Sequence, residues 1–322
     1  MKGTQTLAVR VASKRVEAQD ICTFELVDAQ GGQLPAFTAG SHIDVHLPNG
    51  LTRQYSLCND PTESRRYLIG VLKDPATRGG SAALHEGVNA GDVLAVSAPR
   101  NHFTLAHAAS HSVLLAGGIG ITPILCMAEE LARIGASFAL HYCTRSLERT
   151  AFLERITGSR FAARTHFHFD DGAPGQRIDL DALLAAPRPG LHAYVCGPNG
   201  FMDAVLGTAR ARGWPEAQLH HEFFAGPPTQ SGGDASFEVQ LASSGRVVDV
   251  PAGQSVVQAL AGAGVVIATS CQQGVCGTCL TRVLEGEPDH RDLYLTVAEQ
   301  TANDQFLACC SRARSGRLVL DL

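Results

Sequence analysis

The spacing of four cysteines near the end of the chain constrains the fold more than any other feature. Cys271, Cys276 and Cys279 have four and then two residues between them, within SCQQGVCGTC, and Cys309 follows after 29 more. This is the plant-type spacing of the thiolates that hold a [2Fe-2S] cluster. Two bridged irons need four thiolates, and one wide loop can supply three of them. We therefore predict a cluster ligated by these four residues.

Glycines inside this loop agree with that prediction. Without a Cβ atom, Gly274 and Gly277 allow the backbone to approach the sulfur atoms, where N–H groups tune the reduction potential. A structural zinc site is the main alternative, but it usually has two CxxC pairs. Here only Cys276 and Cys279 form such a pair. The spacing and the glycines together favour the cluster.

The other cysteines need separate interpretations. Cys310 directly follows Cys309, and adjacent residues of an extended segment point in opposite directions. We expect one of the two to reach the cluster, and we choose Cys309. Ten cysteines would also allow disulfides, yet a chain of 322 residues that starts without a secretory segment is not a small disulfide-rich secreted domain. We therefore expect free thiols and a cytoplasmic protein.

Composition narrows the class of protein. A length of 322 residues predicts two or three domains. The net charge of −5, from 26 basic and 31 acidic residues, and the lack of a basic run argue against nucleic-acid binding. An uncharged run at 111–128 contains four glycines or prolines, so it predicts a buried strand and a turn rather than a membrane span. We expect a monomer that binds neither nucleic acid nor a membrane.

Residues 1–105 have the pattern of an antiparallel β-barrel. Short apolar segments alternate with turn formers such as PNG, NDP and AGD. Regular short strands of this kind suggest a closed barrel. The predicted strands are 7–11, 22–27, 42–47, 53–58, 67–72 and 93–97.

Two motifs in this region suit FMN. RQYS, on a predicted strand, offers a forked cation for a phosphate in Arg53, an aromatic face in Tyr55 and a hydroxyl for a ring nitrogen in Ser56. TRGGS, residues 77–81, precedes a predicted short helix at 82–86, and the N–H groups at a helix start bind phosphate. An ordinary polar strand would explain the first motif alone. Together the two predict a flavin mononucleotide site.

Residues 106–225 alternate between strands and helices. This alternation predicts a parallel sheet covered by helices, with a ligand at the carboxyl ends of the strands. GGIGITP, 117–123, and CGPNGFM, 196–202, are glycine-bearing turns at two such ends, although neither has the GxGxxG spacing. The predicted strands are 112–116, 138–143, 165–169 and 193–196, and the predicted helices are 123–133, 150–157, 180–185 and 201–212.

In this order and with these separations, RQYS, TRGGS, GGIGITP, CGPNGFM, HHEFF and the cysteine pattern resemble the phthalate dioxygenase reductase family, which includes vanillate demethylase reductases. The resemblance extends over essentially the whole chain, to PDHRD at 288–292 and the final LVLDL. Members of that family are the reductase components of Rieske oxygenases. The resemblance implies an FMN-binding β-barrel at 1–105, an NADH-binding α/β domain at 106–225, a linker at 226–234 and a [2Fe-2S] ferredoxin domain of the α+β, β-grasp type at 235–322.

The resemblance also implies roles for single residues. Those expected where hydride passes from the nicotinamide to the flavin are Ser56, Thr122, Cys196 and Phe224. Contacts to FMN are expected from Arg53, Tyr55, Ser56, Gly70, Val71, Leu72, Arg78, Gly79, Gly80 and Ser81. Contacts to NADH are expected from Gly117, Gly118, Ile119, Gly120, Thr122, Pro123, Cys196, Gly197, Pro198 and Phe224. Phe223 is expected in the core.

Within the last domain the sequence predicts strands at 237–242 and 246–250, joined by a turn at 243–246. A helix at 256–262, the cluster loop and further strands follow. The run GPPTQSGGD before them consists of turn formers and predicts a linker.

The count of electrons defines the expected function. A nicotinamide gives up two electrons together as hydride, whereas a [2Fe-2S] cluster accepts one, and a flavin can stand between them. The resemblance therefore implies that electrons pass from NADH through FMN and the cluster, one at a time, to a partner Rieske-type aromatic-ring oxygenase or demethylase. We expect no general acid or base. The histidines lack the CxH and CxxH spacing of a Rieske centre, so we do not expect the oxygenase itself.

Three questions stay open at this point. The same electron chain would also serve another acceptor, such as a cytochrome or a non-Rieske hydroxylase. A ferredoxin-like carrier with regulatory nucleotide binding and no turnover is an alternative of another class. The residues also leave NADPH open, because Arg145 in CTRS follows a predicted strand and would suit a 2′-phosphate. NADH is favoured by the resemblance alone.

Overall fold

The computed structural model describes residues 6–74, 79–226 and 234–322. Two compact units divide the chain between Phe224 and Ala225. Arg78 and most of the predicted linker, 227–233, lie outside the described residues. In the described ranges, no helix is both long enough and apolar enough to cross a membrane. All ten cysteines are free thiols.

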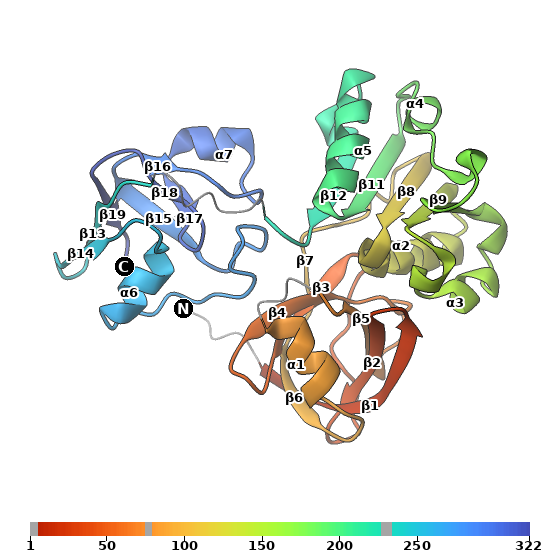
Figure 1. Ribbon diagram of the computed structural model, residues 1–322, viewed down its shortest axis with the longest axis horizontal. Coiled ribbons are helices and arrows are strands. Elements are labelled where there is room, and N and C mark those ends of the chain that lie inside the picture. The colour runs from red at the N-terminus through yellow and green to blue at the C-terminus, as the bar shows by residue number, and fades with distance from the viewer. Residues whose placement is uncertain (1–5, 75–78, 227–233) are drawn as a thin grey trace. The chain divides into compact units, whose positions relative to one another are not determined.

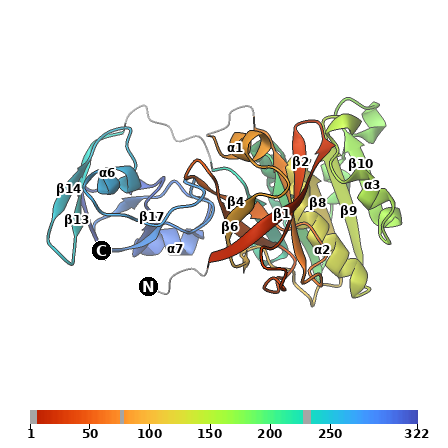
Figure 2. The same cartoon turned by 90° about the horizontal axis from the view of Figure 1, so that it is seen from below.

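The first unit begins with a sheet of seven strands, ordered β4-β3-β6-β1-β2-β5, with β7 paired to β3. Strand β1 runs through this sheet between β2 and β6, antiparallel to both (Figure 2). Beyond β4, an isolated antiparallel bridge joins Leu57 to Ile69 of β5. The elements are β1 (Thr6–Ala18), β2 (Ile21–Asp28), β3 (Ser41–His46), β4 (Thr52–Ser56), β5 (Arg66–Leu72), α1 (Gly80–Gly87), β6 (Val93–Ser97) and β7 (Arg100–Asn101).

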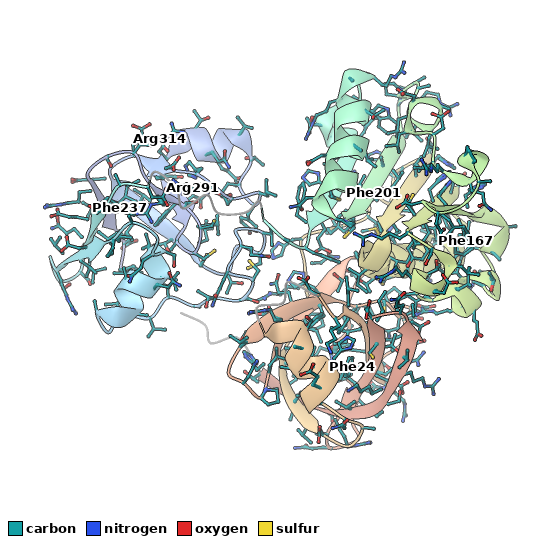
Figure 3. All side chains as sticks on the ribbon, viewed as in Figure 1. Phe24, Phe167, Phe201, Phe237, Arg291 and Arg314 are labelled. Atoms are coloured by element: carbon teal, nitrogen blue, oxygen red, sulfur yellow. The ribbon has the colours of Figure 1, made fainter. Side chains whose placement is uncertain are left out.

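Alternating burial explains why these segments form strands. In β5, Tyr67, Ile69 and Val71 are at most 1 % exposed, while Leu68 between them is only partly buried. Period-two burial of this kind places apolar side chains on one face of a pleated sheet. Phe24 of β2 is fully buried inside this part of the unit (Figure 3). The sheet therefore encloses its own apolar interior.

A second sheet of five parallel strands follows, ordered β10-β9-β8-β11-β12. The predicted parallel sheet is thus confirmed (Figure 1). Its strands are β8 (His111–Gly117), β9 (Phe138–Thr144), β10 (Thr165–Phe169), β11 (Leu191–Gly197) and β12 (Leu219–Phe223). Its helices are α2 (Ile121–Arg133), α3 (Leu153–Thr157), α4 (Leu180–Leu183) and α5 (Asn199–Ala211).

Two apolar clusters cover opposite faces of this sheet. One cluster is continuous from the first sheet into α2 and includes Leu114 of β8 and Tyr194 of β11. The other lies between the opposite face and α5, and includes Leu115 and Val195. Because neighbouring residues of a strand alternate between faces, the central strands β8 and β11 contribute to both clusters. The shared first cluster makes the two sheets one compact unit.

The second unit has a five-stranded sheet ordered β14-β13-β19-β15-β17, and a separate β16-β18 ladder. The predicted turn between its first two strands is confirmed, with Gly245 at φ 68°. Its α6 and α7 both begin with a capping box, from Ser255 and Thr296 respectively. The elements are β13 (Phe237–Leu241), β14 (Val247–Val250), α6 (Val256–Gly262), β15 (Leu280–Glu285), β16 (Pro288–Asp289), α7 (Val297–Ala302), β17 (Gln305–Leu307), β18 (Arg312–Ala313) and β19 (Arg317–Leu320).

Several predicted boundaries need correction. The helix expected at 150–157 begins only at Leu153, because Phe152 adopts a left-handed backbone conformation with φ 58° at the N-cap. The helix expected at 180–185 ends at Leu183. Strand β12 and helix α7 were not predicted as elements. The strand expected at 7–11 is longer than predicted, because β1 continues to Ala18 in pairing with β2. Most of the other predicted elements agree with the structure to within one or two residues.

Candidate functional site

A side-chain hydrogen bond joins the end of β4 to the end of β12. Ser56 donates from Oγ to Oε2 of Glu222 at 3.1 Å, across 166 residues of sequence. Glu222 in turn pairs in register with Cys196 on the neighbouring strand β11. The last residue of RQYS therefore lies beside the carboxyl end of the strand that leads into CGPNGFM. The structure thus brings the predicted Ser56 and Cys196 into one neighbourhood.

A second contact joins the two sheets between β5 and the start of α2. A Cβ atom on Gly70 would lie 3.0 Å from Cγ2 of Thr122 and 3.1 Å from Cζ of Phe152. The Thr122 hydroxyl donates to the carbonyl oxygen of Ile119 at 3.1 Å, which fixes the direction of its side chain. Glycine at position 70 therefore permits the close approach of two segments that the sequence assigns to different cofactors.

Arg53 lies against the start of helix α1. A Cβ atom on Gly80 would be 2.7 Å from both Cγ and Nε of Arg53, so a larger residue there would require the Arg53 side chain to move. Gly79 precedes it in the left-handed region, with φ 84°. The hydroxyl of Ser81 accepts a hydrogen bond from the backbone of Asp74 at 3.2 Å. A guanidinium beside a helix start without acidic residues is a suitable cradle for a phosphate.

The two glycine-bearing turns pack directly against each other. A Cβ atom on Gly120 would lie 2.2 Å from the carbonyl oxygen of Cys196, and one on Gly197 would lie 3.0 Å from Cα of Gly117. Gly117 and Gly197 both face the ring of Phe201, which lies at the start of α5 (Figure 3). Close packing of this kind leaves backbone N–H groups at the carboxyl edge of the sheet, where a pyrophosphate binds in parallel α/β folds.

The other residues expected to contact NADH lie in or next to these two turns, or directly after β12. Gly118, Ile119 and Gly120 form a short 3₁₀ turn, and Pro123 is buried in the first turn of α2. Pro198 is the N-cap of α5. Phe224 follows β12 and is 37 % exposed, whereas Phe223, which was expected in the core, is partly buried and packs on the apolar cluster under α5.

Burial controls the protonation of this neighbourhood. Burial raises the pKa of Glu222 to about 7, and the hydrogen bond from Ser56 opposes that rise. Burial, together with the charge of Glu222, raises the pKa of the Cys196 thiol well above its ordinary value. Burial also raises the pKa of Tyr55. Cys196 and Tyr55 are therefore uncharged near neutral pH, while Glu222 titrates there.

In the second unit, the thiols of the four predicted ligands are linked in a chain. Cys271 hydrogen bonds with both Cys276 and Cys309, and Cys279 hydrogen bonds with Cys309. All four are at most 9 % exposed. Among the described residues, no three His, Cys, Asp or Glu side chains converge closely enough to hold a single metal ion. Four buried thiols are the number of ligands that a [2Fe-2S] cluster requires.

Hydrogen bonding around these thiols matches the same interpretation. The backbone N–H of Gln273 donates to Sγ of Cys271 at 3.3 Å. Gly277 has φ 71°, and a Cβ atom there would lie 2.3 Å from the ring of Tyr294. Hydrogen bonds to sulfur and a tightly packed loop are features that tune the potential of iron–sulfur clusters.

Cys310 occupies a different position from Cys309. Its Sγ lies within hydrogen-bond distance of the carbonyl oxygen of Leu307 and of the Ser311 hydroxyl, at 3.8 Å each. A Cβ atom on Gly274 would lie 2.5 Å from this sulfur. Gly274 therefore makes room for Cys310. Cys309 interacts with both Cys271 and Cys279, and it also hydrogen bonds with Cys310 and lowers the pKa of that thiol.

Sequence reasoning missed two residues of the first unit's site. Glu222 belongs to the HHEFF motif, and His42 is the first residue of the strand predicted at 42–47. His42 pairs in register with Ser56, and its Nδ1 lies 3.9 Å from Oε1 of Glu222. The available signal for Glu222 was an acidic residue within the HHEFF motif. No pattern in the sequence marks His42.

Taken together, these features define an oxidoreductase with a flavin- and nucleotide-binding unit and an iron–sulfur electron-transfer unit. Residues 239–314 match the family model described as a 2Fe-2S iron-sulfur cluster binding domain. The vanillate O-demethylase oxidoreductase of Pseudomonas putida is 59 % identical over 97 % of this chain and 98 % of its own length. The phthalate dioxygenase reductase of Burkholderia cepacia is 41 % identical over 98 % of this chain and 97 % of its own.

A solved structure gives the same result. It is described as phthalate dioxygenase reductase, a modular structure for electron transfer from pyridine nucleotides to [2Fe-2S]. It matches with a TM-score of 0.78 and 41 % identity, and the match covers 98 % of each chain. The chain therefore belongs to the family of phthalate dioxygenase and vanillate O-demethylase reductases.

Proposed function

We propose that this protein passes electrons from NADH through FMN and a [2Fe-2S] cluster, one at a time, to a Rieske-type oxygenase or demethylase. The meeting of Ser56, Glu222 and Cys196 carries this proposal. It joins the strand expected to hold the flavin to the strand end expected to hold the nicotinamide. The thiol chain of the second unit supplies the one-electron site.

In this proposal, residues of the first sheet bind FMN and residues of the second sheet bind the dinucleotide. We assign the phosphate of FMN to Arg53 and to the start of α1 at Gly79, Gly80 and Ser81, with Arg78 before them. The flavin ring is assigned to Tyr55, Ser56 and the backbone of Gly70, Val71 and Leu72. In this assignment the strands of residues 1–105 form a barrel, closed by the bridge between Leu57 and Ile69.

The dinucleotide is assigned to the paired glycine turns. Gly117, Gly118, Ile119 and Gly120 would hold its pyrophosphate, with Thr122 and Pro123 at the helix start. Cys196, Gly197 and Pro198 would border the nicotinamide, and Phe224 would cover the exposed side of the flavin. The partly exposed ring of Phe224 suits a cover that moves aside when the dinucleotide enters.

When bound, the flavin accepts a hydride from the nicotinamide and supplies single electrons to the cluster. The chain provides orientation for that transfer. The hydroxyl of Ser56 is held by Glu222, and Thr122 is held by Ile119. The buried thiol of Cys196 stays neutral and excludes water. Positioning of this kind, rather than acid–base chemistry on the substrate, is what a hydride transfer needs.

For the cluster we assign Cys271, Cys276, Cys279 and Cys309, because their thiols are linked to one another. The second unit is proposed to be a β-grasp ferredoxin domain at 235–322, following a nucleotide-binding domain at 106–225. We propose a reducing compartment, the cytoplasm, because the six cysteines outside the cluster form no disulfide. We further propose that the protein acts as a monomer, because it serves a partner protein transiently.

Anaerobic titration with NADH tests the proposal. Flavin absorbance should bleach first, and the visible absorbance of the cluster should follow. Bleaching of the flavin while the cluster stays oxidised would contradict the proposed path. A co-encoded oxygenase should then accept the electrons, and addition of this partner should restore the oxidised spectrum. Parallel titration with NADPH measures the dinucleotide preference.

A further inference from the structure

We infer that Lys14 is a positioning residue for the FMN phosphate, because it holds helix α1 by the carbonyl groups at the C-terminal end of that helix. This inference rests on the proposed function, in which the start of α1 at Gly79, Gly80 and Ser81 binds the phosphate. Lys14 lies on strand β1, which contributes no residue to the assigned flavin contacts. Its effect on the flavin must therefore pass through the helix.

The ammonium group of Lys14 lies at the C-terminal end of α1. Its Nζ donates to the carbonyl oxygens of His85 at 2.6 Å and Val88 at 2.8 Å, and it lies 3.4 Å from that of Leu84. A lysine ammonium has three hydrogens, so these three acceptors match its donors. The Nζ also lies 5.6 Å from the ring centroid of Phe24, the register partner of Lys14 on β2. Lys14 thus joins the first two strands of the sheet to the end of the helix.

Helix α1 needs support from outside. It has eight residues, and isolated helices shorter than about 12 residues are marginal in water. Its N-cap residue is Gly79, which has no side chain to cap the first turn. Its C-cap residue, Val88, is extended, whereas the C-cap residues of α2, α5 and α6 bond back to carbonyls of their own helix. The Lys14 ammonium binds the last carbonyls of α1 instead.

The position of α1 controls both parts of the phosphate cradle. A Cβ atom on Gly80 would lie 2.7 Å from Cγ and Nε of Arg53, so the helix start and this arginine pack directly against each other. Lys14 acts at the opposite end, about 12 Å away, since eight residues rise about 1.5 Å each. The helix dipole favours a cation at that end and an anion at the start. Loss of the Lys14 contacts would release the helix and move its first N–H groups away from the phosphate.

His85 provides a second link, from α1 to the strand assigned to the flavin ring. Its Nε2 donates to the carbonyl oxygen of Val71 on β5 at 2.8 Å, because a carbonyl can only accept. This contact involves the side chain of His85, whereas Lys14 binds its carbonyl group. Removal of the lysine side chain therefore leaves the link to β5 in place. We expect binding of the phosphate to suffer more than binding of the ring.

Binding of two flavins separates these effects. The full chain is freed of flavin and titrated with FMN and with riboflavin, which has the same ring but no phosphate, and flavin fluorescence measures both. The ratio of the two dissociation constants measures the contribution of the phosphate. In Lys14→Met we expect the dissociation constant for FMN to rise about tenfold or more, and that for riboflavin to stay within about twofold of wild type.

Three further measurements identify a positioning role. The phosphorus-31 resonance of bound FMN should shift in Lys14→Met saturated with FMN, because it reports the surroundings of the phosphate. The rate of flavin reduction by NADH in the same saturated protein should stay within about twofold of wild type, since the ring keeps its contacts. Lys14→Arg should restore most of the affinity for FMN, because a guanidinium also offers several charged donors to the same carbonyls.

Lys73→Met is the matched control. Lys73 follows β5, and its Nζ lies 2.9 Å from Oε1 of Glu86, a residue of the same helix. This ion pair joins two exposed side chains, and such pairs contribute little to stability. The substitution therefore removes a positive charge beside α1 but no contact to its backbone carbonyls. Both dissociation constants should keep their wild-type values.

The outcomes separate the inference from the proposed function. If the wild-type chain binds FMN no more tightly than riboflavin, the phosphate site of the proposed function is wrong. If it prefers FMN and Lys14→Met keeps that preference, the role of Lys14 is refuted. Equal losses for both flavins would also refute it, since they indicate a general structural role, and so would an equal loss of preference in Lys73→Met. Should Lys14→Met fail to fold, Lys14→Gln, which keeps a donor but no charge, is measured with the same expected losses.

Discussion

The two units of this protein build their sites in opposite ways. In the second unit, three of four assigned ligands come from nine consecutive residues, Cys271 to Cys279, and local backbone turns hold them. In the first unit, the site is formed by residues as distant as Ser56 and Glu222, which are 166 residues apart. The first kind of site depends on spacing along the chain. The second depends on how two sheets pack, and a pattern search does not see packing.

The largest effect is expected from removing a ligand of the cluster site in the second unit. Replacing Cys276 with serine should abolish the cluster and with it the reduction of a protein acceptor, because two irons need all four thiolates. NADH-driven reduction of a dye should persist in part, since the first unit keeps its own contacts. Visible absorbance, iron content and the two activities measure this. Retention of a full cluster would show that the ligand set is assigned wrongly.

The next largest effect is expected from disturbing the close packing of the two glycine-bearing turns in the first unit. A Cβ atom on Gly120 would lie 2.2 Å from the carbonyl oxygen of Cys196, so Gly120→Ala must push the two turns apart. We expect a loss of about 1–3 kcal/mol in the free energy of unfolding and weaker binding of NADH. Denaturant unfolding and a binding titration measure the two effects.

Gly207 in α5 provides the control for that variant. Nothing lies within 4 Å of a Cβ atom placed there. Gly207→Ala should therefore stabilise the helix by about 0.5–1 kcal/mol and leave binding unchanged. If both alanine variants behaved alike, close packing of the two turns would not explain the glycine at position 120.

A third prediction concerns pH. Glu222 has an ordinary pKa of 4.5 that rises to about 7 in the folded protein. The folded state therefore binds more protons than the unfolded state between these values, so stability is highest below pH 4.5 with respect to this group and falls as the pH rises through 7. The expected loss is about 3 kcal/mol by pH 8.

Unfolding by urea at pH 5 and pH 8 measures this loss, with Glu222→Gln as the reference. The variant cannot ionise, so it should lack this part of the pH dependence while keeping a hydrogen-bonding partner for Ser56. An identical pH dependence in both proteins would mean that Glu222 is ionised in the folded state throughout this range.

The smallest effect is expected at Cys310, and it tests whether Cys309 or Cys310 is the fourth ligand of the cluster. Cys310→Ser should keep the cluster, because the new hydroxyl can bond to Leu307 and Ser311 as the thiol does. We expect a change of about 1 kcal/mol or less in stability. Cys309→Ser should lose the cluster, as Cys276→Ser does. Reversal of these two results would assign Cys310 as the ligand.

The same contrast explains what the sequence could predict. Strong alternation of apolar residues made the strands of the first sheet predictable, as in β5 around Ile69. Strand β12, with sequence LHHEF, has no such alternation, because polar residues occupy its carboxyl end. It is a strand because it completes the edge of a parallel sheet beside β11. Tertiary pairing thus overrode local propensity, and Glu222 was missed with it.

The glycines of the cluster loop also show what could not be predicted from the sequence. The sequence marked Gly274 and Gly277 as residues that let the backbone approach sulfur. In the structure Gly274 makes room for the thiol of Cys310, and Gly277 makes room for the ring of Tyr294. The requirement for glycine was predictable, but the neighbour that imposes it was not. A neighbour's identity depends on chain segments that come together only in the folded state.

The apolar cluster that continues from the first sheet into α2 has a consequence for how the protein loses its structure. Since Val9 and Tyr194 belong to one interior, neither half of residues 6–224 can melt without exposing the other's apolar surface. Calorimetry should therefore resolve two cooperative transitions rather than three. A substitution in the core of the flavin half would then weaken the binding of the dinucleotide, although the substituted residue does not contact the dinucleotide.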